Sequence, residues 1–395
     1  MSNDFDEARV GASLDALVAE LPSWGFSNTG TRFRVFPQPG TPRDTWEKLD
    51  DAATVHRYTG AAPLISLHIP WDTVDDWGAL RAGAEERGLH IGAINSNTFQ
   101  DEDYRLGSLA HPDAAVRAKA MRHMEECCAI ASATGAHALK VWLGDGTNYP
   151  GQDDFRARKR RLQDALRAVH DRLPGGVRLL IEYKPYEPAL YHTDIQDWGM
   201  ALLLARHAGE HARVVVDLGH HAHGVNIEQI VAILLDEGML GAFDLNDRKY
   251  GDDDLMLGSI NPYQLFLIFN ELAAAAAAGD TAGTCARAVA YMVDQAHNIE
   301  PKIPAMIRTV MTLQEHWAKA LLVDRAALCA AQRSGDIVGA NTALKDAYDT
   351  DVRPLIARWR AARGLPEDPL RAYLDSGEAE ARAVARREGV PAGWS

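Results

Sequence analysis

The sequence predicts an α/β fold, a (β/α)8 barrel followed by a C-terminal helical extension. From residue 60 to 294, a short β-branched or apolar run, a loop and a longer amphipathic segment follow one another repeatedly, which is typical of parallel strands joined through helices. After Pro301 this alternation stops and helical patterns remain. An open, doubly wound sheet is the alternative interpretation. We expect the barrel to occupy residues 1–320 and the extension residues 321–395.

Seven segments have the length and composition of buried strands: residues 63–69, 89–95, 137–142, 178–183, 213–218, 241–246 and 288–294. Helical segments long enough to return the chain lie between or after them, at residues 114–132, 155–172, 195–207, 227–237 and 262–278. A closed barrel needs an eighth strand. We expect it before the other seven, either at residues 24–26 or at residues 31–35.

The extension has the pattern of successive helices over residues 306–387, rich in Ala, Leu and Arg. Short breaks divide it, among them Ser334-Gly335-Asp336 and Gly364-Leu365-Pro366. Such an extension either covers its own barrel or packs on another subunit, and the sequence favours neither.

The composition excludes several classes of protein. The chain has 395 residues, with 41 Lys and Arg against 55 Asp and Glu, so its formal net charge is −14. This acidic balance argues against nucleic acid, which would require a basic face. Four cysteines, two of them adjacent at Cys127 and Cys128, are too few for a disulfide framework. Because we find neither a signal peptide nor an apolar run of roughly 18 residues, we expect a cytoplasmic protein without a membrane segment.

Polar or aromatic residues stand at the carboxyl ends of the predicted strands, where the loops of a parallel α/β fold converge. These residues are His68, Asn95, Asn97, Trp142, Glu182, Lys184, Asp217, His220, Asp244, Asp247 and Asp294. Several carboxylates in one barrel mouth repel one another strongly, and a divalent cation is the simplest way to neutralise them.

Two groups of metal ligands follow from these positions. The first comprises the carboxylates at the ends of the last four strands: Glu182, Asp217, Asp244 and Asp294. An all-oxygen environment of this kind suits Mg²⁺ or Mn²⁺. The second comprises His220 with Asp252 and Asp254, which alternate on the loop after the seventh strand. A single strand-end aspartate is more often a helix cap, but four that converge favour an ion.

Three further residues have both a structural and a functional interpretation. Trp24 and Trp142 would by default pack in the core, but at a barrel mouth an indole could form an apolar wall beside a sugar. Lys184 points to the same face as Glu182, two residues before it, and could bind a ligand or pair with Glu182 or Glu187.

Seven motifs occur in order along nearly the whole chain. They are SWGFSNTGTRF (23–33), SLHIPWD (66–72), NSNTFQ (95–100), EYKP (182–185), DLGHH (217–221), KYGDDDL (249–255) and DQAHN (294–298). Together they closely resemble the bacterial L-rhamnose isomerases of the broad-specificity, pseudomonad-like type, which are xylose-isomerase-like TIM barrels. The resemblance implies a homotetramer that binds two divalent ions, Mn²⁺ first with Co²⁺ or Mg²⁺ as alternatives, and interconverts an aldose and a ketose.

The resemblance also implies roles for individual residues. The ligands of a substrate-anchoring ion would be Glu182, Asp217, Asp294 and, at the fourth position, Asp244. The ligands of a catalytic ion would be His220, Asp252 and Asp254. The sugar-contacting residues would be Trp24, His68, Trp142 and Lys184, and Phe33 lies in a loop that reaches a neighbouring subunit's site. The residues acting in catalysis would be Asp252, His220, Lys184 and His68.

One position departs from the family pattern, because a histidine usually stands where this chain has Asp244. The aspartate keeps a ligand but makes the first site all-carboxylate and one unit more negative, so metal preference and substrate choice stay open. Arg32 and Arg34, on either side of Phe33, could be solvated or could bind an anionic group at the far end of a sugar.

We therefore expect a metal-dependent aldose–ketose isomerase that converts L-rhamnose to L-rhamnulose by a hydride shift between C2 and C1. The alternatives are an isomerase of another aldose, including a C6-modified or anionic hexose, a related sugar epimerase and a non-catalytic sugar-binding barrel. An epimerase needs bases on both faces of one carbon. A non-catalytic barrel would need only one closed metal site.

Overall fold

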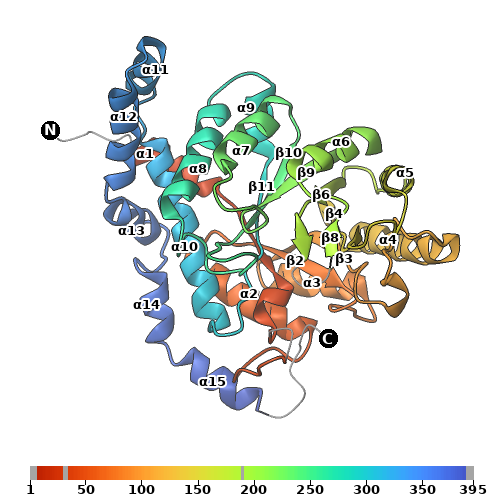
Figure 1. Ribbon diagram of the computed structural model, residues 1–395. Helices are drawn as coiled ribbons and strands as arrows, with labels where there is room; N and C mark the ends of the chain where they lie inside the picture. Colours follow the sequence, from red (N-terminus) through yellow and green to blue (C-terminus); the bar gives the residue numbers. More distant parts are fainter. Residues whose placement is uncertain (1–6, 30–33, 188–190, 388–395) are drawn as a thin grey trace.

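The computed structural model describes residues 7–29, 34–187 and 191–387. In this part of the chain, eight parallel strands form a closed barrel in the order β1-β11-β10-β9-β6-β4-β3-β2, surrounded by helices (Figure 1). The strands are β1 (Ala19–Pro22), β2 (Leu64–Ile69), β3 (His90–Ser96), β4 (Ala138–Val141), β6 (Arg178–Glu182), β9 (Ala212–Asp217), β10 (Leu240–Leu245) and β11 (Ala290–Val293). The predicted (β/α)8 class is confirmed, and the seven predicted strands lie within two residues of the observed bounds.

The first strand was predicted wrongly. We expected it at residues 24–26 or 31–35, but β1 is Ala19–Pro22, paired with β2 on one side and β11 on the other. Ser23–Phe26 forms a 3-10 helix, η1, and most of the second candidate segment lies outside the described residues. The four-residue strand is inconspicuous because it contains Glu20, a charged side chain that is buried and hydrogen-bonded inside the barrel.

Helices return the chain between strands on the outside of the barrel. They are α2 (Thr45–Thr59), α3 (Trp77–Glu86), α4 (Ala114–Thr134), α5 (Phe155–His170), α6 (Trp198–Ala208), α7 (Ile227–Asp236), α8 (Pro262–Ala276), α9 (Thr281–Ala288) and α10 (Lys302–Leu321), with α1 (Glu7–Asp15) preceding β1. Many begin at an aspartate whose side chain accepts a backbone N–H of the first turn, as Asp113 does for α4 and Asp197 for α6.

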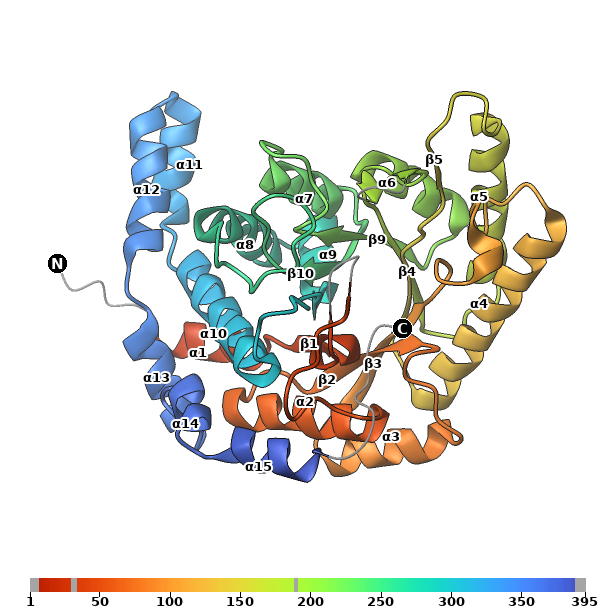
Figure 2. The same cartoon turned by 60° about the horizontal axis from the view of Figure 1, so that its bottom comes forward.

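The C-terminal helices are α11 (Arg325–Ser334), α12 (Ile337–Asp349), α13 (Arg353–Ala361), α14 (Pro369–Leu374) and α15 (Glu378–Ala385). Figure 2 shows α11 and α12 projecting as a pair and α13 to α15 running along the outside of the barrel. The end of the extension is tied to α2, because Arg386 donates to Asp51 at 2.8 Å and Arg57 to Glu378 at 2.8 Å. The end of the extension thus packs on the barrel of its own chain, and packing of α11 and α12 on another subunit stays a prediction.

A small antiparallel sheet, which we did not predict, lies beside the barrel mouth. Its strands are β5 (Gly146–Thr147), β8 (Tyr191–Thr193) and β7 (Tyr186–Glu187), in that order. They belong to the segments after β4 and β6, so the sheet supports Glu187 at the edge of the site described below.

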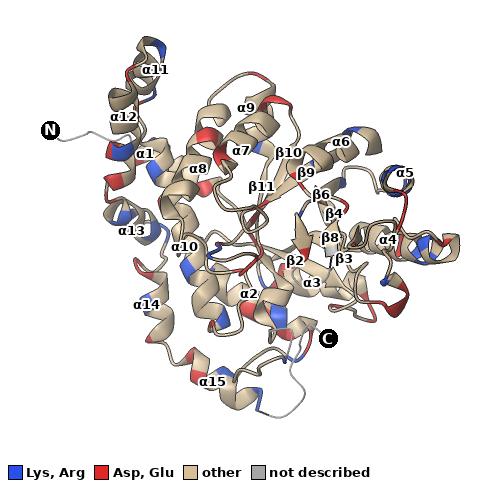
Figure 3. Ribbon diagram, in the orientation of Figure 1, with Lys and Arg blue, Asp and Glu red and all other residues tan. Residues whose placement is uncertain are grey.

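The placement of basic residues and the hydropathy of the helices are as follows. In the view of Figure 3, basic residues lie on separate helices, among them α4, α5 and α13, and do not form one continuous stripe. Within the described ranges, no helix is both long and apolar enough to span a membrane.

Candidate active site

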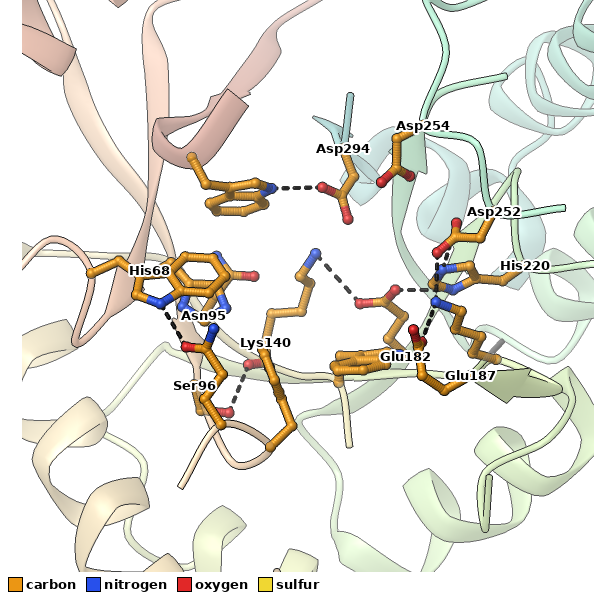
Figure 4. A pocket seen from close by; sticks show the side chains of 16 residues that line it. His68, Asn95, Ser96, Lys140, Glu182, Glu187, His220, Asp252, Asp254 and Asp294 are labelled. Atoms are coloured by element: carbon orange, nitrogen blue, oxygen red, sulfur yellow. Dashed lines mark hydrogen bonds and ion pairs between the residues drawn. The ribbon is translucent and has the colours of Figure 1, made fainter. Parts of the chain in front are cut away.

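A cavity of about 400 Å³ lies at the carboxyl ends of the barrel strands (Figure 4). Its lining residues are Trp24, His68, Trp71, Asn95, Ser96, Phe99, Gln100, Lys140, Trp142, Glu182, Lys184, Glu187, His220, Asp252, Asp254 and Asp294. In a barrel of parallel strands all these ends meet at one mouth, where active sites are built.

The four strand-end carboxylates come together as predicted. Glu182 ends β6, Asp217 ends β9, Asp244 lies in β10 in register with Asp217, and Asp294 directly follows β11. One oxygen from each lies within 4.8 Å of the others. Glu182, Asp217 and Asp244 are buried, and Asp294 is partly buried and accepts a hydrogen bond from Trp24 Nε1 at 2.7 Å.

Burial and mutual repulsion make this group costly to ionise. Burial raises the pKa of Asp217 to about 7, and the carboxylates of Glu182 and Asp252 add to the rise. The pKa of Asp244 is raised well above its ordinary value for the same two reasons, burial and neighbouring carboxylates. Glu182 behaves differently because burial is outweighed by Lys140 and His220, which lower its pKa to about 2.

The second predicted group lies beside the first. His220 Nε2 is 3.2 Å from Asp252 Oδ1, and His220 Nδ1 is 3.1 Å from Glu182 Oε1. Asp254 has a backbone φ of 48°, a conformation that few non-glycine residues adopt. Asn246 donates to both Asp217, at 3.0 Å, and Asp254, at 3.4 Å, and so joins the two groups. Burial, followed by Asp252 and Asp294, raises the pKa of Asp254 well above its ordinary value.

Asp253 does not join its neighbours. Its Oδ2 accepts backbone N–H groups of Lys249, at 2.5 Å, and Tyr250, at 2.7 Å, so it closes the turn while Asp252 and Asp254 line the cavity. This separation is the one that the alternation of the three aspartates predicts.

The donors of both groups fit divalent cations. They comprise carboxylate oxygens and one imidazole nitrogen, the ligand types that Mn²⁺ and Mg²⁺ accept. Around the cavity, seven carboxyl groups face two ammonium groups, those of Lys140 and Lys184. No donor among the described residues reaches the buried Oδ1 of Asp244. With all seven carboxyl groups ionised, the site would carry more buried negative charge than its own residues neutralise. The assignment of individual ligands stays a prediction.

Lys184 pairs with two carboxylates at the edge of the site. Its Nζ lies 2.5 Å from Asp252 Oδ2 and 2.7 Å from Glu187 Oε2. Burial alone would lower the pKa of Lys184, but these two carboxylates raise it above its ordinary value. Of the partners that we considered, Glu187 is the one that Lys184 binds.

The opposite wall is aromatic. The His68 ring stacks on Trp71 with centroids 3.7 Å apart and meets Trp24 edge-on at 5.6 Å. Phe99 packs edge-on against Trp142 at 4.8 Å. Burial holds the pKa of His68 well below its usual range, and its Nδ1 has no hydrogen-bond partner in the described structure.

Other predicted residues lie elsewhere. Asp247 accepts the backbone N–H groups of Ile260, at 2.8 Å, and Asn261, at 2.9 Å, so it holds a loop and does not line the cavity. Phe33 and Arg32 lie outside the described residues, and Arg34 is exposed.

Sequence reasoning missed Lys140, whose Nζ is 2.6 Å from Asp244 Oδ2, and gave no role to the cavity residues Trp71 and Phe99. The available signal was a lysine in the middle of an otherwise buried strand, because a buried ammonium is rare unless it is paired.

The fold and the comparisons with known proteins define the family of this barrel. Residues 57–271 match the xylose isomerase-like TIM barrel family model, and the chain belongs to this family. It is 44% identical, over 98% of its length and 91% of the relative's, to a probable sugar isomerase of Rhizobium meliloti (strain 1021). It is 29% identical to the xylose isomerase of Thermus thermophilus, over 48% of this chain and 51% of that one.

Solved structures show the same fold at low identity. The D-psicose 3-epimerase of Clostridium cellulolyticum H10 superposes with a TM-score of 0.53 and 12% identity, over 77% of this chain and 99% of that chain. An L-ribulose 3-epimerase superposes with a TM-score of 0.52 and 14% identity, over 84% and 97% of the two chains. At such identity the likeness shows the architecture alone.

Proposed function

We propose that the protein is a divalent-metal-dependent aldose–ketose isomerase whose sugars are L-rhamnose and L-rhamnulose. One observation carries the choice of isomerisation: the carboxylates that line the cavity gather on one wall, and His68, Asn95 and Ser96 lie on the other (Figure 4). Isomerisation needs charge on two neighbouring sugar oxygens to be held from one side. Epimerisation needs bases on both faces of one carbon.

Bound divalent ions would act as Lewis acids toward the oxygens on C1 and C2 while hydride moves between these carbons. The side chains of the cavity position the sugar and its protons. Lys184, held by Asp252 and Glu187, donates a hydrogen bond to the negative charge that develops on O1. His220 and Asp252 form the side of the cavity toward which the O2 proton leaves, and O1 takes up one proton after hydride has moved from C2 to C1, so that aldose and ketose have the same composition. His68 is neutral and offers its unpartnered Nδ1 to the ring-opening end of the sugar.

The aromatic wall supports a 6-deoxy sugar. Trp71, Phe99 and Trp142 present apolar surface, which accommodates a methyl group better than a charged one. Among the described lining residues, both lysines are already paired with carboxylates, so an anionic C6 group would meet no unpaired ammonium. This favours L-rhamnose over an anionic hexose.

The remaining features of the proposal come from the family resemblance and the composition. We propose Mn²⁺ as the preferred ion, with Co²⁺ or Mg²⁺ as alternatives, and a homotetramer in which the loop around Phe33 completes a neighbour's site. We also propose that the protein is cytoplasmic, which agrees with the free thiols of its four cysteines.

A panel of sugars tests the proposed reaction. The purified protein, loaded with Mn²⁺, is incubated with L-rhamnose, L-mannose, L-lyxose, D-allose and a C6-anionic hexose, and ketose formation is measured. We expect the highest kcat/KM with L-rhamnose. A higher value with the anionic hexose would refute the sugar assignment but keep the isomerase. Epimerised ketoses without aldose–ketose exchange would refute the isomerase, and sugar binding without turnover would show a non-catalytic barrel.

A further inference from the structure

A buried lysine lies inside the acidic group. Lys140 is in the middle of β4, and its side chain extends toward the carboxylates, as Figure 4 shows. It is 4% exposed, and its Nζ lies 2.6 Å from Asp244 Oδ2 and 3.4 Å from Glu182 Oε2. Because a buried ammonium is costly without a counter-charge, these two carboxylates hold it in place.

The two carboxylate oxygens of Asp244 have different surroundings because of the contact with Lys140. Oδ2 accepts the ammonium of Lys140, while no donor in the described structure reaches the buried Oδ1. Two other members of the group are held by neutral donors: Asp294 by Trp24 Nε1 at 2.7 Å, and Asp217 by Asn246 Nδ2 at 3.0 Å. Asp244 is therefore the nearer of the two carboxylates that Lys140 pairs with, Glu182 being the more distant one, and it keeps one oxygen without a donor.

We propose that Lys140 is a positioning residue for the cation of the four-carboxylate group. Its ammonium neutralises Asp244, so that this ligand contributes an oxygen without adding net charge, and it turns Oδ1 toward the ion. Together with this ammonium, the four ionised carboxylates then carry a net charge of −3, not −4. From the sequence we expected Asp244 to make the site one unit more negative, because that expectation did not include Lys140. This inference rests on the proposed function, in which the group holds a divalent ion.

A mutant cycle on the full-length, metal-stripped protein tests the pairing. The Mn²⁺ dissociation constants and the number of ions per chain are measured by titration calorimetry and elemental analysis. Asp244→Asn leaves the ammonium beside the ion without its nearer carboxylate partner, so we expect at least 100-fold weaker binding at one site. Adding Lys140→Met to Asp244→Asn removes the repulsion, and we expect at least a tenfold recovery.

A matched cycle separates pairing from a general charge effect. Asp294→Asn keeps the acceptor for Trp24, and its partner is not Lys140, so Lys140→Met should recover less than threefold there. Lys140→Arg, which keeps the positive charge, should bind Mn²⁺ within tenfold of the wild type. Thermal unfolding by circular dichroism checks each variant, and Lys140→Gln replaces Lys140→Met in both cycles if the methionine variant does not unfold cooperatively.

The outcomes distinguish this inference from the proposed function. If the wild type binds two ions but the Asp244 and Asp294 cycles recover equally, the inference is wrong and the isomerase stands. If the wild type binds one ion and Lys140→Met gains a second, the ammonium takes the place of an ion and the inference is again wrong. A wild type that binds no divalent ion would overturn both.

Discussion

The two walls of the cavity differ in how their buried carboxylates are neutralised. On the aromatic side, the fully buried Asp72 is neutralised within the chain, because Lys48 Nζ lies 2.5 Å from its Oδ1 while Ser23 and the His68 amide donate to its Oδ2. On the acidic side, carboxylates outnumber the ammonium groups that face them. The comparison teaches that burial of a carboxylate alone does not indicate a metal. Burial of several carboxylates without enough internal counter-charges does indicate a metal.

The internal pair also has a function for the site. Asp72 binds the residue next to Trp24 and the backbone of His68, so it sets the positions of two residues that line the cavity. The acidic wall is positioned by the register of β9, β10 and β11, in which Asp217 lies opposite Asp244. One wall is therefore held by contacts within the chain, and under the proposed function the other is completed by cations.

The largest expected effect is on the acidic wall. Asp252→Asn removes the carboxylate that contacts both His220 and Lys184, so we expect kcat to fall by at least about 1,000-fold, as when a charge-stabilising group is lost, with a smaller change in KM. Steady-state kinetics with L-rhamnose measures it. An unchanged kcat would remove Asp252 from the catalytic residues.

The next effect is on the stability of the aromatic wall. Lys48→Met leaves Asp72 buried without its counter-charge, and we expect a loss of about 3–5 kcal/mol in the free energy of unfolding. Urea denaturation measures it, with Lys345→Met as the matched control, since the exposed Lys345–Asp349 pair is screened by solvent and its loss should change the free energy of unfolding little.

The effect of metal on the free energy of unfolding should distinguish the two walls further. Mn²⁺ at 100 times its dissociation constant should stabilise the wild type by about 2.7 kcal/mol per site and should leave the loss caused by Lys48→Met unchanged. The account of the two walls would be wrong if Lys48→Met cost no more than the control, or if Mn²⁺ restored the lost stability.

The smallest effect is expected where only apolar contact is lost. Trp142→Ala removes the indole that packs on Phe99 and faces the cavity, so KM for L-rhamnose should rise about tenfold, equivalent to about 1.4 kcal/mol, while kcat changes less. Initial-rate kinetics separates the two parameters. A fall in kcat with an unchanged KM would place Trp142 in the chemical step instead.

Much of this arrangement is predictable from sequence, since the carboxyl ends of parallel strands meet at one mouth whatever the details of packing. That rule correctly predicted that four carboxylates lie close together, namely Glu182, Asp217, Asp244 and Asp294. It could not predict the role of Lys140. Strand periodicity indicates which face of the sheet a residue lies on, but it does not show that a lysine on β4 contacts Asp244 across the barrel. Nor could it pair Lys48 of α2 with Asp72, a contact made by tertiary packing alone.

The central claim is that the acidic wall binds divalent cations that the isomerisation requires. The direct measurement is ketose formation from L-rhamnose by full-length protein stripped with EDTA, dialysed, and then titrated with Mn²⁺ or Co²⁺. We predict that activity is lost on stripping and returns as the ions bind at the dissociation constants measured by calorimetry. Activity that survives in protein shown by elemental analysis to be free of metal would contradict the account.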